Sequence, residues 1–168
     1  MATLSYTADD AYLVGILDGE GTVGVYHYES PKESKTIVSV AVQMCERGPL
    51  EKLRTRFGGT IGAPRRHSDP FNERHRPISS WKIVNEKARP ALELLRDFSF
   101  TTKRQQANLA LEALTYIARA RERCRTKGLH PSKRKLTLFP EELLQRKALA
   151  NAVAALKRVS DNGLAHIH

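Results

Sequence analysis

Hydrophobic and polar residues recur along the chain with two different periods, which predict helices and strands in turn. Near the N-terminus the apolar residues have helical spacing, and Asp9 or Asp10 can cap a helix that runs to about Asp18. The period then changes to two over residues 22–27 and again over residues 36–44, where valines occupy one face. The first part of the chain is therefore predicted to be a helix followed by two strands.

The rest of the chain is predicted to add a helix, two more strands and then helices. This order indicates an α+β fold with one mixed or antiparallel sheet that helices cover on one side. The glycine pair at 58–59 is suited to end the second helix. The further predicted elements are a helix at 50–57, strands at 60–63 and 79–84, and helices at 87–96, 102–119 and 141–159. The apolar stripe of the last helix is expected on Leu144, Ala148, Ala152, Leu156 and Val159.

The 168-residue chain carries a strong excess of positive charge. Lys and Arg number 28 against 18 Asp and Glu, which gives a formal net charge of +10 and a pI near 9.9. A field of this sign favours a polyanionic partner, either nucleic acid or an acidic membrane surface. Eight of the basic residues fall within residues 119–135. That segment either contacts phosphates or connects two helices.

Length and composition indicate one domain, residues 1–168, of a soluble intracellular protein. No apolar run reaches the roughly 18 residues of a membrane span, and the first ten residues lack the pattern of a secretory signal. Cys45 and Cys124 are far apart, without the paired spacing of a zinc site or a disulfide framework. These features argue against a secreted protein.

Two carboxylates stand at the end of the first predicted helix, in the stretch Asp18-Gly19-Glu20. Because the C-terminal end of a helix carries partial negative charge, each costs about 0.3–1 kcal/mol when exposed. A divalent cation would reverse that penalty, since Mg²⁺ prefers carboxylate and carbonyl oxygens. The alternative is a helix that ends in two solvated acids. Gly15 and Gly19 lie four residues apart, where they let a second helix approach closely.

Two segments resemble a known family. Residues 12–25, YLVGILDGEGTVGV, resemble the signature helix of the LAGLIDADG homing endonucleases together with the strand behind it. Residues 101–114, TTKRQQANLALEAL, resemble the Lys-x-x-Gln-Ala-Asn-Leu segment of the single-motif members. The likeness covers about residues 9–120. It implies the αββαββα fold with C-terminal helices, a saddle-shaped sheet, and cleavage of both strands of a long pseudo-palindromic DNA target.

The resemblance also implies a homodimer and a metal site. Members with one motif pair two signature helices around a two-fold axis. It implies that Glu20 and the backbone carbonyl of Gly19 hold Mg²⁺, for which Mn²⁺ can substitute, whereas Ca²⁺ can bind without supporting cleavage. Asp18 matches an acid that shapes the helix end. The implied dimer interface comprises Tyr12, Gly15, Ile16, Asp18 and Gly19.

The remaining catalytic positions follow from the same resemblance. Lys103 matches a lysine that sits near the reacting phosphate; alternatively it is a solvated lysine at a helix start. Glu46 falls near the metal position by strand register, and Arg47 either replaces a family arginine or is a surface residue. An RNA-splicing maturase and a sequence-specific DNA-binding protein without cleavage activity remain the competing functions. No membrane or small-molecule partner is expected.

Strand alternation assigns one sheet face to the core and the other to DNA, where a strand pair can enter the major groove. We call the second face the predicted reading face. Basic residues in loops are expected to contact phosphates, which position a protein without specifying sequence. The predicted reading face comprises Gly24, Tyr26, Tyr28, Ser39, Ala41, Gln43, Ser80 and Lys82. The predicted phosphate contacts are Lys32, Lys35, Arg65, Arg66, Arg74 and Arg76.

Overall fold

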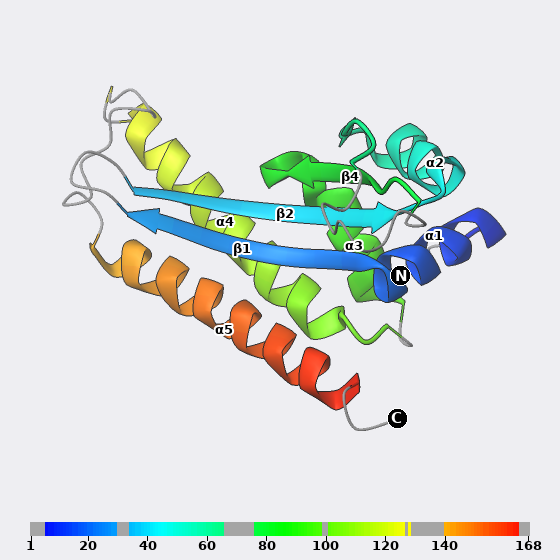
Figure 1. Cartoon of the computed structure of the whole chain (residues 1–168). Coiled ribbons are helices and arrows are strands. Elements are labelled where there is room, and N and C mark those ends of the chain that lie inside the picture. Colours follow the sequence, from blue (N-terminus) through cyan, green and yellow to red (C-terminus); the bar gives the residue numbers. More distant parts are fainter. Residues whose placement is uncertain are drawn as a thin grey trace.

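The computed structural model describes residues 6–29, 34–65, 76–98, 101–126, 128 and 140–164. The elements follow the predicted order, which confirms the α+β class (Figure 1). The sheet is antiparallel throughout, with strand order β1-β2-β4-β3. The elements are α1 (Ala8–Gly19), β1 (Gly21–Glu29), β2 (Ser34–Met44), α2 (Arg47–Phe57), β3 (Thr60–Ile61), β4 (Ser79–Val84), a 3-10 turn η1 (Asn85–Ala88), α3 (Arg89–Asp97), α4 (Arg104–Thr126) and α5 (Pro140–Leu164).

Thr7 caps α1, so the prediction that Asp9 or Asp10 would do so is wrong. The Thr7 hydroxyl accepts a hydrogen bond from the Asp10 backbone N–H at 3.1 Å, and the Thr7 N–H donates to the Asp10 carboxylate at 3.2 Å. Asp10 therefore closes a capping box from the third helical position, and a helix gains two satisfied backbone donors in this way. The carboxylate also accepts from Arg56 of α2 at 3.2 Å, which joins the first two helices.

The sheet buries the face on which the valines of β1 and β2 lie, as strand alternation predicted. Val38, Val40 and Val42 are fully buried and belong to one core with Trp81 and Ile83 of β4. The helices α3 and α4 pass behind this face, as Figure 1 shows. The other face of the β1–β2 pair presents exposed side chains, so the fold leaves an open surface along the long strands.

Trp81 connects the end of α2 to this core. Its buried indole N–H donates to the carbonyl of Gly58 at 2.8 Å. Gly58 has a φ of 77° and Gly59 a φ of 89°, the left-handed region that glycine adopts without strain. A Cβ on Gly59 would lie 2.7 Å from the Lys82 carbonyl. The predicted helix end at this glycine pair is confirmed, while the helix begins earlier, at Arg47.

The buried face of α5 differs from the predicted stripe. Leu144 is 66% exposed, whereas Leu149 and Val153 are buried at 8% and 1%. The difference arises because α5 packs against both α4 and the outer strand β1. Glu142, with 6% exposure, lies on the same buried side and pairs with Arg123 of α4 at 2.8 Å. An ion pair thus occupies a position that a purely apolar stripe cannot predict.

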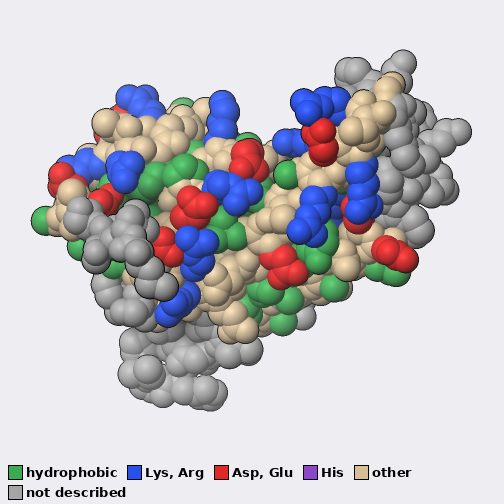
Figure 2. All heavy atoms as spheres, turned by 180° about the vertical axis from the view of Figure 1, so that it is seen from behind, with side chains coloured by type: hydrophobic (Ala, Val, Ile, Leu, Met, Phe, Trp, Pro, Cys, Tyr) green, Lys and Arg blue, Asp and Glu red, His purple; other side chains and the backbone are tan. Residues whose placement is uncertain are grey.

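The helix α4 extends to Thr126, beyond the predicted end at Arg119. It therefore takes up the first part of the basic segment 119–135, most of whose remainder lies outside the described residues. Seen from behind, the described surface intersperses Lys and Arg side chains with Asp and Glu (Figure 2). In the described part of the chain, no helix combines the length and apolar character needed to cross a bilayer.

Candidate active site and sheet surface

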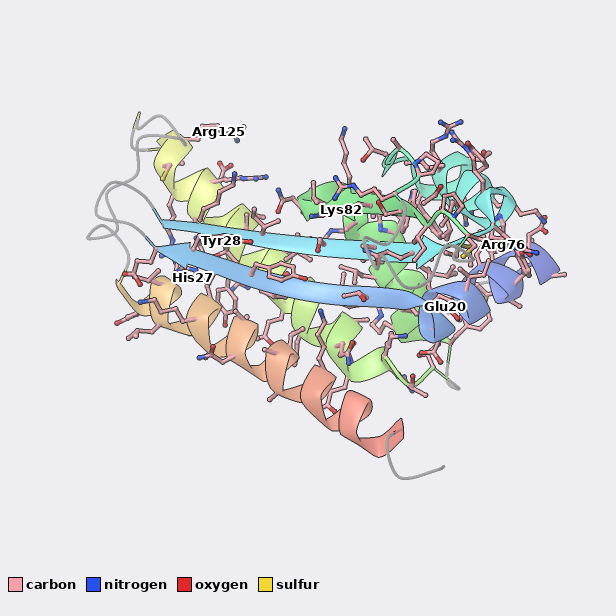
Figure 3. The ribbon with its side chains drawn as sticks, in the orientation of Figure 1. Glu20, His27, Tyr28, Arg76, Lys82 and Arg125 are labelled. Atoms are coloured by element: carbon pink, nitrogen blue, oxygen red, sulfur yellow. The ribbon has the colours of Figure 1, made fainter. Side chains whose placement is uncertain are left out.

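Glu20 lies at the junction where α1 ends and β1 begins (Figure 3). Its backbone N–H closes the last turn by donating to the Ile16 carbonyl at 2.9 Å, and its side chain is exposed. The chain turns into the strand at once, and a Cβ on Gly21 would lie 2.2 Å from the Leu17 carbonyl oxygen. Only glycine at position 21 therefore allows the helix to deliver Glu20 directly to the sheet end.

Asp18 attaches the end of α1 to the start of α4. One carboxylate oxygen accepts hydrogen bonds from the Thr102 hydroxyl and from the Lys103 backbone N–H, both at 3.0 Å. The first backbone N–H groups of a helix have no intrahelical partner, so this carboxylate acts as a cap from a different element. Asp18 therefore connects the end of α1 to the start of α4, and its predicted role in shaping the end of α1 stays a prediction.

The side chain of Lys103 forms a second connection between the start of α4 and the end of α1. Its ammonium group donates to the backbone carbonyl of Asp18, and the side chain is half-buried. Burial lowers the pKa of Lys103, while the negative charges of Asp18 and Glu20 raise it in part; the net pKa lies below the usual lysine value. Lys103 is therefore not fully solvated, because it is half-buried and hydrogen-bonded beside the acidic end of α1.

Glu46 and Arg47 lie at the start of α2 and are both exposed. Glu46 occupies the cap position without forming a side-chain cap, and Arg47 pairs with Glu51 at 3.0 Å along the same helix. Gly21 pairs with Val42, so the end of β2 approaches the end of the hairpin that carries Glu20. The placement of Glu46 near the metal position stays a prediction, and Arg47 forms its ion pair along α2.

Among the described residues, no three His, Cys, Asp or Glu side chains gather as a metal-binding group. The donors that remain at the α1 end are the exposed Glu20 carboxylate and the helix-end carbonyls, which lack intrahelical partners. These are hard oxygen ligands of the type that Mg²⁺ and Ca²⁺ bind. One copy of the chain therefore fits a divalent cation chemically but supplies a single free carboxylate at the helix tip.

One side of α1 is open along its length. A Cβ built on Gly15 or on Gly19 would meet no atom within 4 Å, and Tyr12 is 46% exposed. Val14, which precedes Gly15 in sequence, is fully buried on another side of the helix. Of the residues predicted for a dimer interface, Tyr12, Gly15 and Gly19 are therefore exposed, whereas Ile16 packs partly against the core and the Asp18 side chain is bonded to the start of α4.

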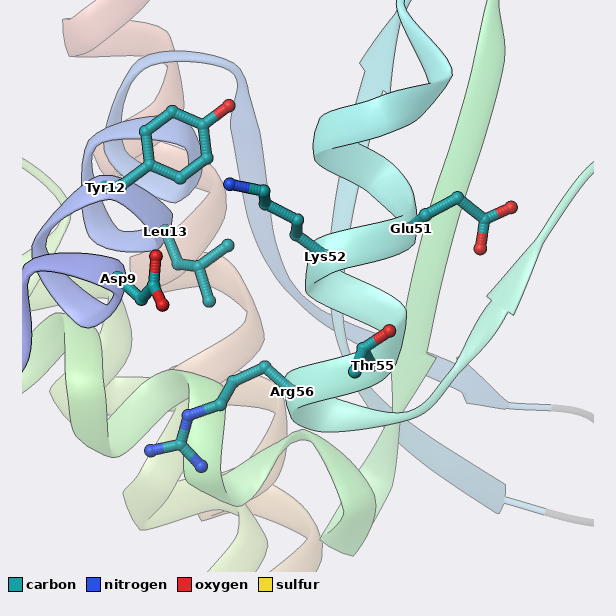
Figure 4. A pocket seen from close by; sticks show the side chains of 7 residues that line it. All are labelled: Asp9, Tyr12, Leu13, Glu51, Lys52, Thr55 and Arg56. Carbon is teal, nitrogen blue, oxygen red and sulfur yellow. The ribbon is translucent and has the colours of Figure 1, made fainter.

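A groove with a volume of about 540 Å³ continues this surface between α1 and α2 (Figure 4). Its floor includes Tyr12, and the ammonium of Lys52 lies 4.7 Å from the Tyr12 ring centroid. The sequence does not predict this groove, because the groove depends on how two helices pack and no local pattern specifies that packing. The lining residues are Asp9, Tyr12, Leu13, Glu51, Lys52, Thr55 and Arg56.

The predicted reading face is only partly accessible. Tyr28 is 57% exposed and Tyr26 39% exposed, and Gln43 and Lys82 are also exposed, while Ala41 and Ser80 are half-buried. Gly24 and Ser39 lie on this face by register but are buried. Their accessibility is therefore a correction to the expectation from strand alternation.

The predicted phosphate contacts divide into described and undescribed residues. Lys35, Arg65 and Arg76 are exposed. The Arg65 backbone forms an isolated bridge with Ile78, with both hydrogen bonds at 2.9 Å, which holds Arg65 beside the strand β4. Lys32, Arg66 and Arg74 fall outside the described residues.

The fold is similar to those of several solved homing endonuclease structures. I-CvuI, a homing endonuclease crystallised with its target in the presence of calcium, matches with a TM-score of 0.63 at 20% identity over 88% of this chain and 80% of that chain. The homing endonuclease I-TnaI matches with a TM-score of 0.59 at 18% identity over 91% and 96%. The I-SmaMI LAGLIDADG homing endonuclease, bound to cleaved DNA, matches with a TM-score of 0.54 at 21% identity over 68% and 38%.

The chain has the LAGLIDADG homing endonuclease fold. This confirms the fold that the two sequence segments implied. No protein-family model matches the sequence, and no curated protein matches it. In the terms of the LAGLIDADG fold, α1 is the signature helix and the sheet carries the open face beside it.

Proposed function

We propose that this chain is a metal-dependent, site-specific DNA endonuclease of the LAGLIDADG family that acts as a homodimer. The single observation that carries the proposal is the joint between α1 and α4, where Lys103 is fixed beside the helix end that exposes Glu20. The fold alone is compatible with DNA binding without cleavage. The retained acid and the anchored lysine favour the enzyme over a maturase or an inactive DNA-binding protein.

The proposed chemistry is hydrolysis of a phosphodiester bond. A bound divalent cation lowers the pKa of a coordinated water and stabilises charge on the attacking and leaving oxygens. Glu20 and the carbonyl of Gly19 would hold the cation. The Lys103 ammonium would stabilise negative charge that builds on the phosphate. Because this ammonium is half-buried and already held in place, it would need no reorganisation during the reaction. Asp18 keeps both elements in place and needs no direct contact with the substrate.

The homodimer is proposed from the open side of α1. With nothing within 4 Å of the Cβ positions of Gly15 and Gly19, a second copy of α1 can approach backbone to backbone. A two-fold axis there brings two Glu20 carboxylates to one centre, where their mutual repulsion calls for bound cations. One site per copy then cleaves one DNA strand each, and the target should be pseudo-palindromic.

Selection from randomised duplex DNA tests the proposed function. The purified protein is incubated with a circular library in Mg²⁺, and the linearised molecules are sequenced. We expect recovery of one pseudo-palindromic site, with double-strand cuts whose yield disappears in EDTA. Recovery of bound but uncut DNA would favour the DNA-binding protein instead, and absence of any enriched sequence would contradict the proposal.

A further inference from the structure

The part of the predicted reading face around Gly24 is covered by the ring of Tyr26, which lies two residues further along β1. Gly24 pairs with Ser39 across β1 and β2, and Ser39 is only 3% exposed. A Cβ built on Gly24 would lie 2.5 Å from Cε2 and 2.7 Å from the hydroxyl oxygen of Tyr26. The Tyr26 ring therefore occupies the space above Gly24, and the absence of a side chain at position 24 makes that space.

A residue of α5 reaches the same ring. The ammonium of Lys157 lies 5.7 Å from the Tyr26 ring centroid, a distance at which a cation is attracted to an aromatic face. The helix is anchored along β1 by buried Val153 and by an ion pair between Lys147 and Glu29. Lys157 is consequently carried on a fixed element beside the outer edge of the sheet.

These contacts decide which side chains on this stretch can reach a base. Direct reading in the major groove needs an accessible polar atom, and a phenol hydroxyl both donates and accepts hydrogen bonds. Tyr26 is 39% exposed, whereas Ser39 offers almost no surface and Gly24 has no side chain. A base pair that faces this stretch meets Tyr26 first.

Building on the proposed DNA-cleaving function, we propose that Tyr26 is a specificity-determining residue, that Lys157 is its positioning residue, and that Gly24 and Ser39 contact no base. Gly24 has no side chain and so leaves space for the Tyr26 ring, and Lys157 attracts that ring from the edge of the sheet. The phenol is therefore preorganised before DNA binds. Less ordering is then needed on binding, which sharpens discrimination at that base pair. The C-terminal helix thereby contributes to sequence recognition although it lies outside the sheet.

The geometry can be tested in the free protein, without DNA. An aromatic ring above Gly24 displaces the NMR resonances of the Gly24 α-protons, and this displacement should disappear in Tyr26→Leu. It should shrink in Lys157→Ala, persist in Lys157→Arg and persist in the control Tyr28→Leu, which removes the neighbouring exposed ring. Gly24 resonances that are the same in Tyr26→Leu as in the parent would overturn the proposed arrangement.

The role in recognition is tested with the sequence selected from randomised DNA and all its single-base variants. Tyr26→Phe, which keeps the ring, and Lys157→Ala should both lose discrimination at the same base pair of each half-site, by about tenfold, the scale of a good base contact. Ser39→Ala and Lys157→Arg should keep the parent's profile. An unchanged profile for Tyr26→Phe, or a changed one for Ser39→Ala, would overturn the proposal.

Two further outcomes separate this inference from the proposed function. If Lys157→Ala weakens binding to all variants equally, Lys157 contacts phosphate only, and its positioning role is wrong. If the parent protein selects no sequence at all, the DNA-cleaving function fails together with the role of Tyr26, while the NMR comparison still decides the geometry. Failure of the inference alone appears as an unaltered Tyr26→Phe profile in a parent that cleaves normally.

Discussion

At the scale of single residues, the candidate site depends on side chains whose roles differ although their chemistry is alike. Asp18 and Glu20 are neighbouring acids at one helix end, yet Asp18 accepts two hydrogen bonds from the start of α4 while Glu20 is exposed. The carboxylate that is occupied by backbone and hydroxyl donors is poorly suited to a metal. The free one is suited to it.

Replacing Asp18 by Ala should therefore act on stability and on Lys103 rather than on metal binding. Loss of the two hydrogen bonds to a charged acceptor should lower the free energy of unfolding by about 1–3 kcal/mol. It should also slow cleavage, because the Lys103 backbone loses its bond to the carboxylate and the ammonium keeps only the Asp18 backbone carbonyl. The affinity for Ca²⁺ in the DNA complex should stay near the parent's. Urea denaturation, cleavage rates and calcium titration measure the three effects, with the exposed Glu112→Ala as the control. A variant of unchanged stability that binds no calcium would assign Asp18 to the metal instead.

The sequence predicted the residues of the site better than their contacts. Glu20 and Lys103 stand within short motifs, so a resemblance of a few residues was enough to single them out. The hydrogen bond from Thr102 to Asp18 joins residues 84 positions apart, whose proximity depends on tertiary packing. Gly24 and Tyr26 share a face of one strand, but alternation does not specify that the ring turns over Gly24. Strand alternation states which face a residue occupies and cannot state which neighbour covers it, which is why Ser39 was predicted to be accessible.

At the scale of elements, the helix starts and helix pairs carry charged groups that join one element to the next. Asp10 is the example with a pH dependence. Burial raises the pKa of Asp10. Hydrogen bonds from Thr7 and the nearby Arg56 guanidinium lower the pKa by more than burial raises it, so the net pKa is below the usual value. A lowered folded-state pKa stabilises the protein above the unfolded-state pKa, and that contribution is lost as the pH falls through the folded-state value.

In Asp10→Asn, the free energy of unfolding should accordingly depend less on pH in the acidic range than it does in the parent. The variant should lose about 1–2 kcal/mol at pH 7, where the capping box and the ion pair are complete. The gap to the parent should narrow as the pH falls below about 4 towards the lowered pKa of Asp10, because the parent's carboxylate then takes up a proton. Urea titrations across that pH range measure the gap. A difference that stays constant down to pH 2 would show that Asp10 contributes through packing alone.

The ion pairs between α4 and α5 permit a matched comparison of adjacent residues. Glu142 is 6% exposed and pairs with Arg123, whereas Glu141 is exposed at the same helix start. The Arg123 side chain is 56% exposed and water can solvate it, but Glu142 also lies 3.8 Å from Arg146, whose side chain is 11% exposed. Glu142→Ala should therefore destabilise the protein by about 1–3 kcal/mol. Glu141→Ala should cost less than about 1 kcal/mol, the helix-end charge term alone. Equal effects in thermal or urea unfolding would contradict the buried role of Glu142.

The order of elements was predictable, but the orientation of α5 was not. Helical spacing allows more than one apolar face when Ala and Leu are frequent, and the contacts with α4 and β1 select the face with Leu149 and Val153. The buried Glu142 lies on that same face, where a pattern of apolar residues gives no sign of it. Tertiary packing therefore decided what periodicity left open.

At the scale of the whole molecule, the proposed assembly should be sensitive to the glycine face of α1. Gly15→Leu introduces a side chain where the single copy has open space, so it should leave the monomer folded. In a dimer the same side chain separates two backbones, and the variant should sediment as a monomer with its cleavage lost. Sedimentation of the parent as a monomer, both free and on DNA, would contradict the homodimer.

The net charge of the assembly has a measurable consequence as well. Two copies at +10 each give a dimer of +20, a field that draws in DNA of any sequence. Binding should weaken steeply as salt rises, because each phosphate contact releases counterions. In the proposed function, the charge would supply general attraction to DNA, while the sheet face and Tyr26 would supply preference among sequences.

The most direct test of the central claim is Glu20→Gln assayed for cutting and binding on the same selected DNA. The substitution removes the metal-binding charge and leaves the sheet face untouched. We predict that cleavage in Mg²⁺ falls at least about a hundredfold, the scale seen when one charge-stabilising group is lost. Binding measured in EDTA should be no weaker than the parent's. A variant that still cuts at near the parent rate would contradict the proposed site at the end of α1.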